Sequence, residues 1–129
     1  MNTFNKILVS SVMAVSMAAM SFTAAAVANP SYEDVKAAIV NTKAKVEETI
    51  TALNNGTDND VLAGMISDAR QLQKDIANNV LDLKRNQASN VLKQARTAVI
   101  NNERESAKES LTDAANRYKE IEQLYATNH

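Results

Sequence analysis

The segment AKESLTDAANRYKEIEQLY, residues 107–125, decides the fold class, because its apolar positions recur at alternating steps of four and three. These positions are Ala107, Leu111, Ala114, Tyr118, Ile121 and Tyr125. Side chains at such steps share one face of an α-helix, so the segment predicts an amphipathic helix with one buried stripe. The alternation of apolar and polar residues that is typical of strands appears nowhere in the sequence, and an all-α fold is expected.

The same spacing predicts a helix between Pro30 and Gly56. Ser31 and Asp34 match the S-x-x-[DE] form of a capping box, which marks the start of a helix. Gly56 is well placed as a left-handed cap at its end. The predicted buried face holds Val35, Ile39, Thr42, Val46, Thr49 or Ile50, and Leu53.

Two further helices are expected between residues 58 and 101. Asp58 or Asp60 can cap the first, whose predicted seam is Leu62, Met65, Ala69, Leu72 and Ile76. The second is marked by Leu81, Ala88, Leu92, Ala95 and Val99. The boundary between them falls at 77–79 or at 86–90, neither of which contains Gly or Pro. A single helix from 58 to 101 is the alternative.

An internal echo favours the boundary at 77–79 and a bundle of two similar hairpins. TALNNG (51–56) resembles TAVINN (97–102), and ISDARQLQKDI (66–76) resembles LTDAANRYKEI (111–121). Two copies of a helical hairpin form an antiparallel up-down-up-down four-helix bundle, with helices of about 20–24 residues. The alternative is that two amphipathic helices resemble each other by chance.

The first 28 residues have the order of a secretory signal peptide: the cation Lys6, an apolar run from Ile7, and small residues ending at Ala26-Val27-Ala28. Cleavage before Asn29 is expected, and an uncleaved membrane anchor is the alternative. The domain would then be 29–129, periplasmic or secreted from a bacterium, with no membrane contact after cleavage. The chain has no Cys, so packing alone must stabilise it, and its Ala-rich seams favour moderate stability or a homodimer.

The residue types argue against an enzyme, a cofactor or a metal site. The only histidine, His129, is the last residue, and a frayed terminus cannot orient a catalytic imidazole. Met65 is interpreted as seam packing rather than as a haem ligand. A calcium loop that began at Asp58, within the polar stretch ALNNGTDND (52–60), would place the apolar residues Val61, Leu62 and Ala63 where oxygens are required. The stretch is interpreted as a helix corner, and its Asn55-Gly56-Thr57 motif matters only in a host that glycosylates.

The charge distribution points to an interaction surface. Between Lys45 and Arg70 every charged residue is acidic, and between Asp82 and Glu103 every charged residue is basic. In an up-down-up-down bundle the first and third corners share one end. That end would gather six acidic residues, which we call the acidic pole: Glu47, Glu48, Asp58, Asp60, Glu103 and Glu105. Two interpretations stay open, namely helix-dipole complements with routine ion pairs and a surface that attracts a cation or a basic partner.

The segment KQARTAVINNERESAKESLTDAANRYKEI, residues 93–121, resembles the helix-turn-helix units of the small metal-binding protein family of periplasmic bundles. The order of signal, four helices and short corners is also similar to cytochrome b562-like proteins. Both resemblances imply a bundle in the periplasm. They transfer no ligand, because Tyr118, Lys119 and Glu120 stand where an axial histidine would be expected.

We therefore expect an exported, non-enzymatic bundle that acts through surface interaction, as an accessory or stress-related binding protein. The expected partner is a protein or a cation at the acidic pole. Nucleic acid is disfavoured by the acidic balance of the chain. The alternative function is a periplasmic carrier of a metal or a small ligand.

Overall fold

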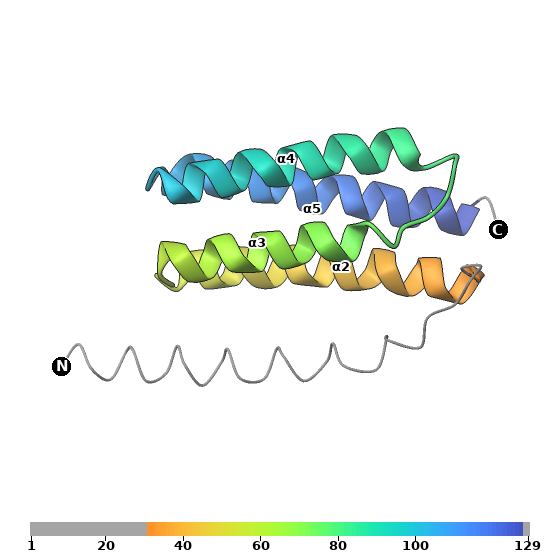
Figure 1. Cartoon of the computed structure of the whole chain (residues 1–129), viewed down its shortest axis with the longest axis horizontal. Coiled ribbons are helices and arrows are strands. Elements are labelled where there is room, and N and C mark those ends of the chain that lie inside the picture. Colours follow the sequence, from red (N-terminus) through yellow and green to blue (C-terminus); the bar gives the residue numbers. More distant parts are fainter. Residues whose placement is uncertain (1–30, 128–129) are drawn as a thin grey trace.

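The computed structural model describes residues 31–127, which form four helices: α2 (Tyr32–Asn54), α3 (Asn59–Gln73), α4 (Asp82–Ile100) and α5 (Arg104–Thr127). Helix α2 packs against α3 and α5, and α4 packs against the same two helices. Figure 1 shows the helices lying lengthwise beside one another, with the two short corners at the left. The expected all-α, up-down-up-down bundle is confirmed. The expected signal peptide, residues 1–28, lies outside the described residues.

The ends of α2 and α5 meet at the other end of the bundle. The N–H of Asp34 donates to Ser31 Oγ at 3.2 Å, and the N–H of Ser31 donates to Asp34 Oδ2 at 3.1 Å, which confirms the capping box. The rings of Tyr32 and Tyr125 stack with centroids 4.9 Å apart, and the Tyr125 hydroxyl donates to the Tyr32 carbonyl at 3.2 Å. These contacts hold the first turn of α2 against the last turns of α5.

The core follows the predicted stripes on three of the four helices. Thr49 rather than Ile50 completes the buried face of α2, and the predicted stripes of α4 and α5 are buried along their whole lengths. Two buried threonines donate to the carbonyl one turn earlier in α2: Thr42 to Ala38 and Thr49 to Lys45, each at 2.7 Å. Their hydroxyls are therefore satisfied within the helix, and the core of α2 contains no unpaired side-chain group.

Helix α3 differs from the prediction in its face and in its length. Ile66 and Gln73 are buried, whereas the predicted seam residues Met65 and Leu72 are only half-buried. The helix ends at Gln73, because the next three N–H groups bond to carbonyls three residues back and tighten the chain into turns. The expected length of 20–24 residues is therefore wrong for α3, which has 15 residues, and for α4, which has 19.

The segment 74–81 then crosses from α3 to α4, which confirms the boundary at 77–79 and rules out one helix from 58 to 101. Ile76 and Leu81 are buried and anchor this segment. The Asn78 side chain accepts from the N–H of Val80 at 2.9 Å, so a local side-chain bond shapes the turn without Gly or Pro. Within residues 31–127 no helix is long and apolar enough to cross a membrane.

Candidate functional site

The two corners at the left of Figure 1 have the same backbone design. Gly56 has φ 81° and Asn102 has φ 61°, so each corner places one residue in the left-handed region. In the first corner the N–H of Thr57 donates to the Ala52 carbonyl at 3.1 Å, and in the other the N–H of Glu103 donates to the Ala98 carbonyl at 2.8 Å. Both are Schellman caps, and the predicted cap at Gly56 is confirmed.

Arg104, the first residue of α5, joins the two corners. Its Nη1 donates to Asn59 Oδ1 at 2.6 Å, and its Nη2 donates to the Leu53 carbonyl at 3.0 Å. Asn59 in turn donates from Nδ2 to Asn102 Oδ1 at 3.0 Å. The two corners are thus at the same end of the bundle, as expected, and a guanidinium with neutral partners fixes them to each other.

The residues of the acidic pole lie in or near these corners, and most of them have no ion pair. Asp58, Asp60, Glu103 and Glu105 are exposed, and none is ion-paired with another described residue. Glu47 is exposed too, whereas Glu48 is half-buried and accepts from Lys45 Nζ at 2.9 Å. Since Arg104 is bonded to an amide and a carbonyl, it neutralises no carboxylate through a direct contact.

The predicted cap at the start of α3 is only half present. Asp58 occupies the N-cap position with an extended backbone, but its side chain makes no capping hydrogen bond. Asp60 lies in the first turn of α3 and Glu105 in the first turn of α5. Their negative charges complement the positive ends of those helix dipoles by about 0.3–1 kcal/mol each, so the dipoles account for part of the acidic pole.

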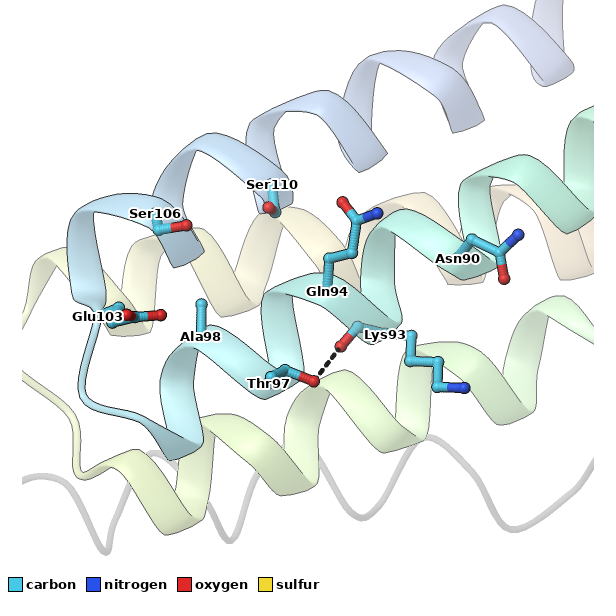
Figure 2. Close-up of a pocket in the computed structure, with 8 residues that line it drawn as sticks. All are labelled: Asn90, Lys93, Gln94, Thr97, Ala98, Glu103, Ser106 and Ser110. Carbon is cyan, nitrogen blue, oxygen red and sulfur yellow. Dashed lines mark hydrogen bonds between the residues drawn. The ribbon is translucent and has the colours of Figure 1, made fainter.

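The basic residues of α4 do not neutralise the acidic pole. Arg96 donates from Nε to Ser67 Oγ at 3.0 Å instead of pairing with a carboxylate. Lys93 lines a shallow groove between α4 and α5 with Glu103 and six polar or small residues: Asn90, Gln94, Thr97, Ala98, Ser106 and Ser110. Figure 2 shows Thr97 turned back to donate to the Lys93 carbonyl, a bond of 3.1 Å. The two charged residues of this open groove, Lys93 and Glu103, are both exposed.

Met65, His129 and the acidic residues are among the side chains that could hold a metal or a haem. Within residues 31–127 no three His, Cys, Asp or Glu side chains meet in a group that could hold a metal ion. Met65 is half-buried and packs against the edge of the core. His129 lies outside the described residues. Of the three residues at the axial position of the cytochrome resemblance, Tyr118 is buried, while Lys119 and Glu120 are exposed.

A second polar feature, which the sequence spacing did not predict, lies inside the bundle. Four buried side-chain atoms have no hydrogen-bond partner among the described residues, and they belong to Arg70, Gln73, Arg85 and Tyr118. Burial raises the pKa of the Tyr118 hydroxyl well above its ordinary value, while the positive charges of Arg85 and Arg70 oppose that shift. The only sign of this feature in the sequence is the polar residue Gln73. When the two similar segments 66–76 and 111–121 are aligned, Gln73 stands at the position of Tyr118.

Comparison of this chain with protein-family models, with curated proteins and with solved structures finds no match.

Proposed function

We propose that this protein is an exported, non-enzymatic bundle that binds a basic protein segment at its acidic pole. One observation carries the proposal: Asp58, Asp60, Glu103 and Glu105 are exposed and unpaired at a single end, beside an arginine whose donors are bonded to neutral groups. Acidic residues in other parts of the bundle do form ion pairs, as Glu122 does with Lys43 at 2.7 Å along the α2–α5 contact.

The physics of such a surface favours a charged partner and a salt-sensitive contact. Like charges at one end add their fields and attract a lysine- or arginine-rich segment from a distance. At physiological ionic strength the screening length is about 8 Å, so the attraction acts near the surface and weakens as salt rises. The Arg104 contacts keep the two corners in register, which limits the ordering cost when a partner binds.

The experiment compares two variants that each lose four acidic charges. The acidic-pole variant carries Asp58→Asn, Asp60→Asn, Glu103→Gln and Glu105→Gln. The matched control carries Glu33→Gln, Asp68→Asn, Asp75→Asn and Glu109→Gln, at exposed acids that form no ion pair with a described residue. Binding of a lysine-rich peptide should be lost in the first variant and retained in the second. Equal binding by both variants would exclude the acidic pole as the site.

Export itself has a separate test. Expression of the full chain in a bacterium, followed by mass spectrometry of the periplasmic fraction, should find a protein that begins at Asn29. A chain that keeps residues 1–28 and sediments with membranes would instead support the uncleaved anchor. This result is independent of the peptide measurement, so export and partner binding are judged separately.

A small-ligand carrier is the second candidate function, and the buried polar atoms around Tyr118 favour it. Metal transport has no comparable support among residues 31–127, where no metal-binding group forms. Calorimetric titration with divalent metal salts tests it directly: micromolar binding with a defined stoichiometry would establish a metal carrier, and the absence of heat would remove that candidate.

A further inference from the structure

The unpaired polar atoms of the core are concentrated on four side chains, which we call the polar cluster: Arg70, Gln73, Arg85 and Tyr118. Among residues 31–127 these are the only buried side-chain nitrogen and oxygen atoms without a hydrogen-bond partner. Leaving a buried donor or acceptor unpaired costs about 1–3 kcal/mol. Native proteins contain only a few such groups, and each of them calls for a physical reason.

The four side chains come from three helices, α3, α4 and α5. Arg70 and Gln73 are three residues apart, and so are neighbours on the surface of α3. From α4, Arg85 donates from Nη1 to the Ile76 carbonyl at 3.3 Å, which places its guanidinium beside the end of α3. From α5, the buried phenol of Tyr118 feels the positive charges of both arginines. The polar cluster therefore lies inside the bundle at the level where α3 ends.

The polar cluster is rich in donors and positively charged. Arg70 makes no hydrogen bond or ion pair with any described residue, and the nearest carboxylate oxygen to Arg85 is that of Asp82, 3.5 Å from Nη2. The Tyr118 hydroxyl stays protonated at neutral pH and can donate. The free donors are the Nε–H groups of Arg70 and Arg85 and the Tyr118 hydroxyl. The oxygen atoms of a carboxylate or phosphate group accept charge-assisted hydrogen bonds from such donors.

We propose that Arg70, Arg85 and Tyr118 form a binding site for a small oxyanion or carboxylate, reached between α3 and α4. Access is from the side of the two arginines, which are half-buried, and not from the wholly buried ring of Tyr118. The anion supplies acceptors to the three donors that the protein leaves unpaired, namely Arg70 Nε, Arg85 Nε and the Tyr118 hydroxyl. The unpaired atom of Gln73 is the acceptor Oε1, which cannot bind the anion directly. This site lies inside the bundle and does not depend on the acidic pole.

The test uses the full exported chain and two probes, inorganic phosphate and acetate, each compared with sodium chloride at equal ionic strength. Nuclear magnetic resonance follows the Nε–H signals of the arginines and the ring signals of Tyr118. We expect saturable shifts for Arg70, Arg85 and Tyr118 with at least one probe. Saturation by phosphate alone indicates a phosphate-type ligand, and saturation by acetate indicates a carboxylate.

Variants separate binding from folding. Arg70→Gln removes a cation that has no protein partner, and Tyr118→Phe keeps the ring that fills the core, so both variants should fold. Each should weaken anion binding at least about tenfold, the effect of losing one charge-assisted hydrogen bond. Arg117→Gln is the matched control, since Arg117 lies on α5 and pairs only with Asp113 at 3.1 Å, and it should bind as the unchanged protein does.

Three outcomes would overturn the proposal. Signals that respond to neither probe would mean that the unpaired groups are bridged only by water. Shifts that grow without saturation would indicate general ionic strength effects. Equal affinity in Arg70→Gln and Arg117→Gln would place any bound anion elsewhere on the protein. None of these outcomes bears on the binding of a basic segment at the acidic pole, which is judged by the peptide measurement. Each of them would also remove the observation that favours a small-ligand carrier.

Discussion

Replacing Arg104 by glutamine should loosen the end of the bundle that carries the acidic pole. The guanidinium makes two bonds there, to Asn59 Oδ1 at 2.6 Å and to the Leu53 carbonyl at 3.0 Å. Hydrogen bonds from a charged donor contribute about 1.5–3 kcal/mol each when they are well buried. Arg104 is half-buried, so the lower part of that range applies.

The partners of Arg104 keep or form other hydrogen bonds in the variant, which makes the loss of stability smaller. The Leu53 carbonyl also accepts from the N–H of Gly56 at 3.2 Å, so it keeps one partner in the variant. Asn59 keeps its bond to Asn102 and can turn its freed oxygen to water. We therefore expect Arg104→Gln to lower the free energy of unfolding by about 1.5 kcal/mol in total. For a domain of about 100 residues this corresponds to a fall in Tm of about 6–12 °C.

Thermal unfolding followed by circular dichroism measures the change, with Arg117→Gln as the matched control. Arg117 forms an exposed pair with Asp113 one turn earlier, and such pairs contribute only about 0.3–0.5 kcal/mol. Arg104→Gln should therefore unfold several degrees below Arg117→Gln. If the two variants unfold at the same temperature, the contacts of Arg104 do not fix the corners to each other.

Three further predictions concern the corners and the core. Gly56→Ala should lower the free energy of unfolding by about 1 kcal/mol, because φ is 81° there and a Cβ meets no atom within 4 Å, so the cost lies in the backbone alone. Asn102 has φ 61°, so Asn102→Gly should raise the free energy of unfolding, measured in urea, by a few tenths of a kcal/mol. A lower free energy of unfolding would instead show that losing the Asn59–Asn102 bond costs more than the relief of the backbone gains. The third prediction is that the protein loses stability as pH rises above the ordinary tyrosine pKa of 10.0, since the raised pKa of buried Tyr118 keeps the folded state protonated while the unfolded state ionises. As pH rises from neutral to alkaline, the helix content of Tyr118→Phe should fall at a higher pH than that of the unchanged protein. The same midpoint pH in both proteins would contradict the role given to Tyr118.

The sequence was sufficient for the features that depend on neighbours along the chain. The four- and three-residue steps predicted the buried stripes of α4 and α5, and local chemistry predicted the capping box at Ser31 and the left-handed cap at Gly56. The resemblance between the corner sequences also has a structural counterpart, since Asn102 takes the role of Gly56 with the same hydrogen bonds. Each of these features is decided within one or two helical turns.

The features that the sequence did not predict depend on partners far along the chain. In the sequence, nothing distinguishes Arg104 from an ordinary surface cation. Its contacts with Asn59 and Leu53 arise only when the chain folds. The early end of α3 follows from a turn that combines the Asn78 side-chain bond with the burial of Ile76 and Leu81, in a stretch without Gly or Pro. The buried face of α3 contains Ile66 and Gln73 in place of the predicted Met65 and Leu72. A rule based on apolar spacing misses this face, because the polar residue Gln73 occupies a core position.

The most direct test of the proposed function is a quantitative pull-down from periplasmic extract with three baits: the unchanged protein, the acidic-pole variant and the matched four-acid control. We expect the first and third baits to capture a defined set of proteins that is released as salt is raised, and the second bait to lack this set. Capture of the same set, at the same yield, by the acidic-pole variant would contradict the proposed function.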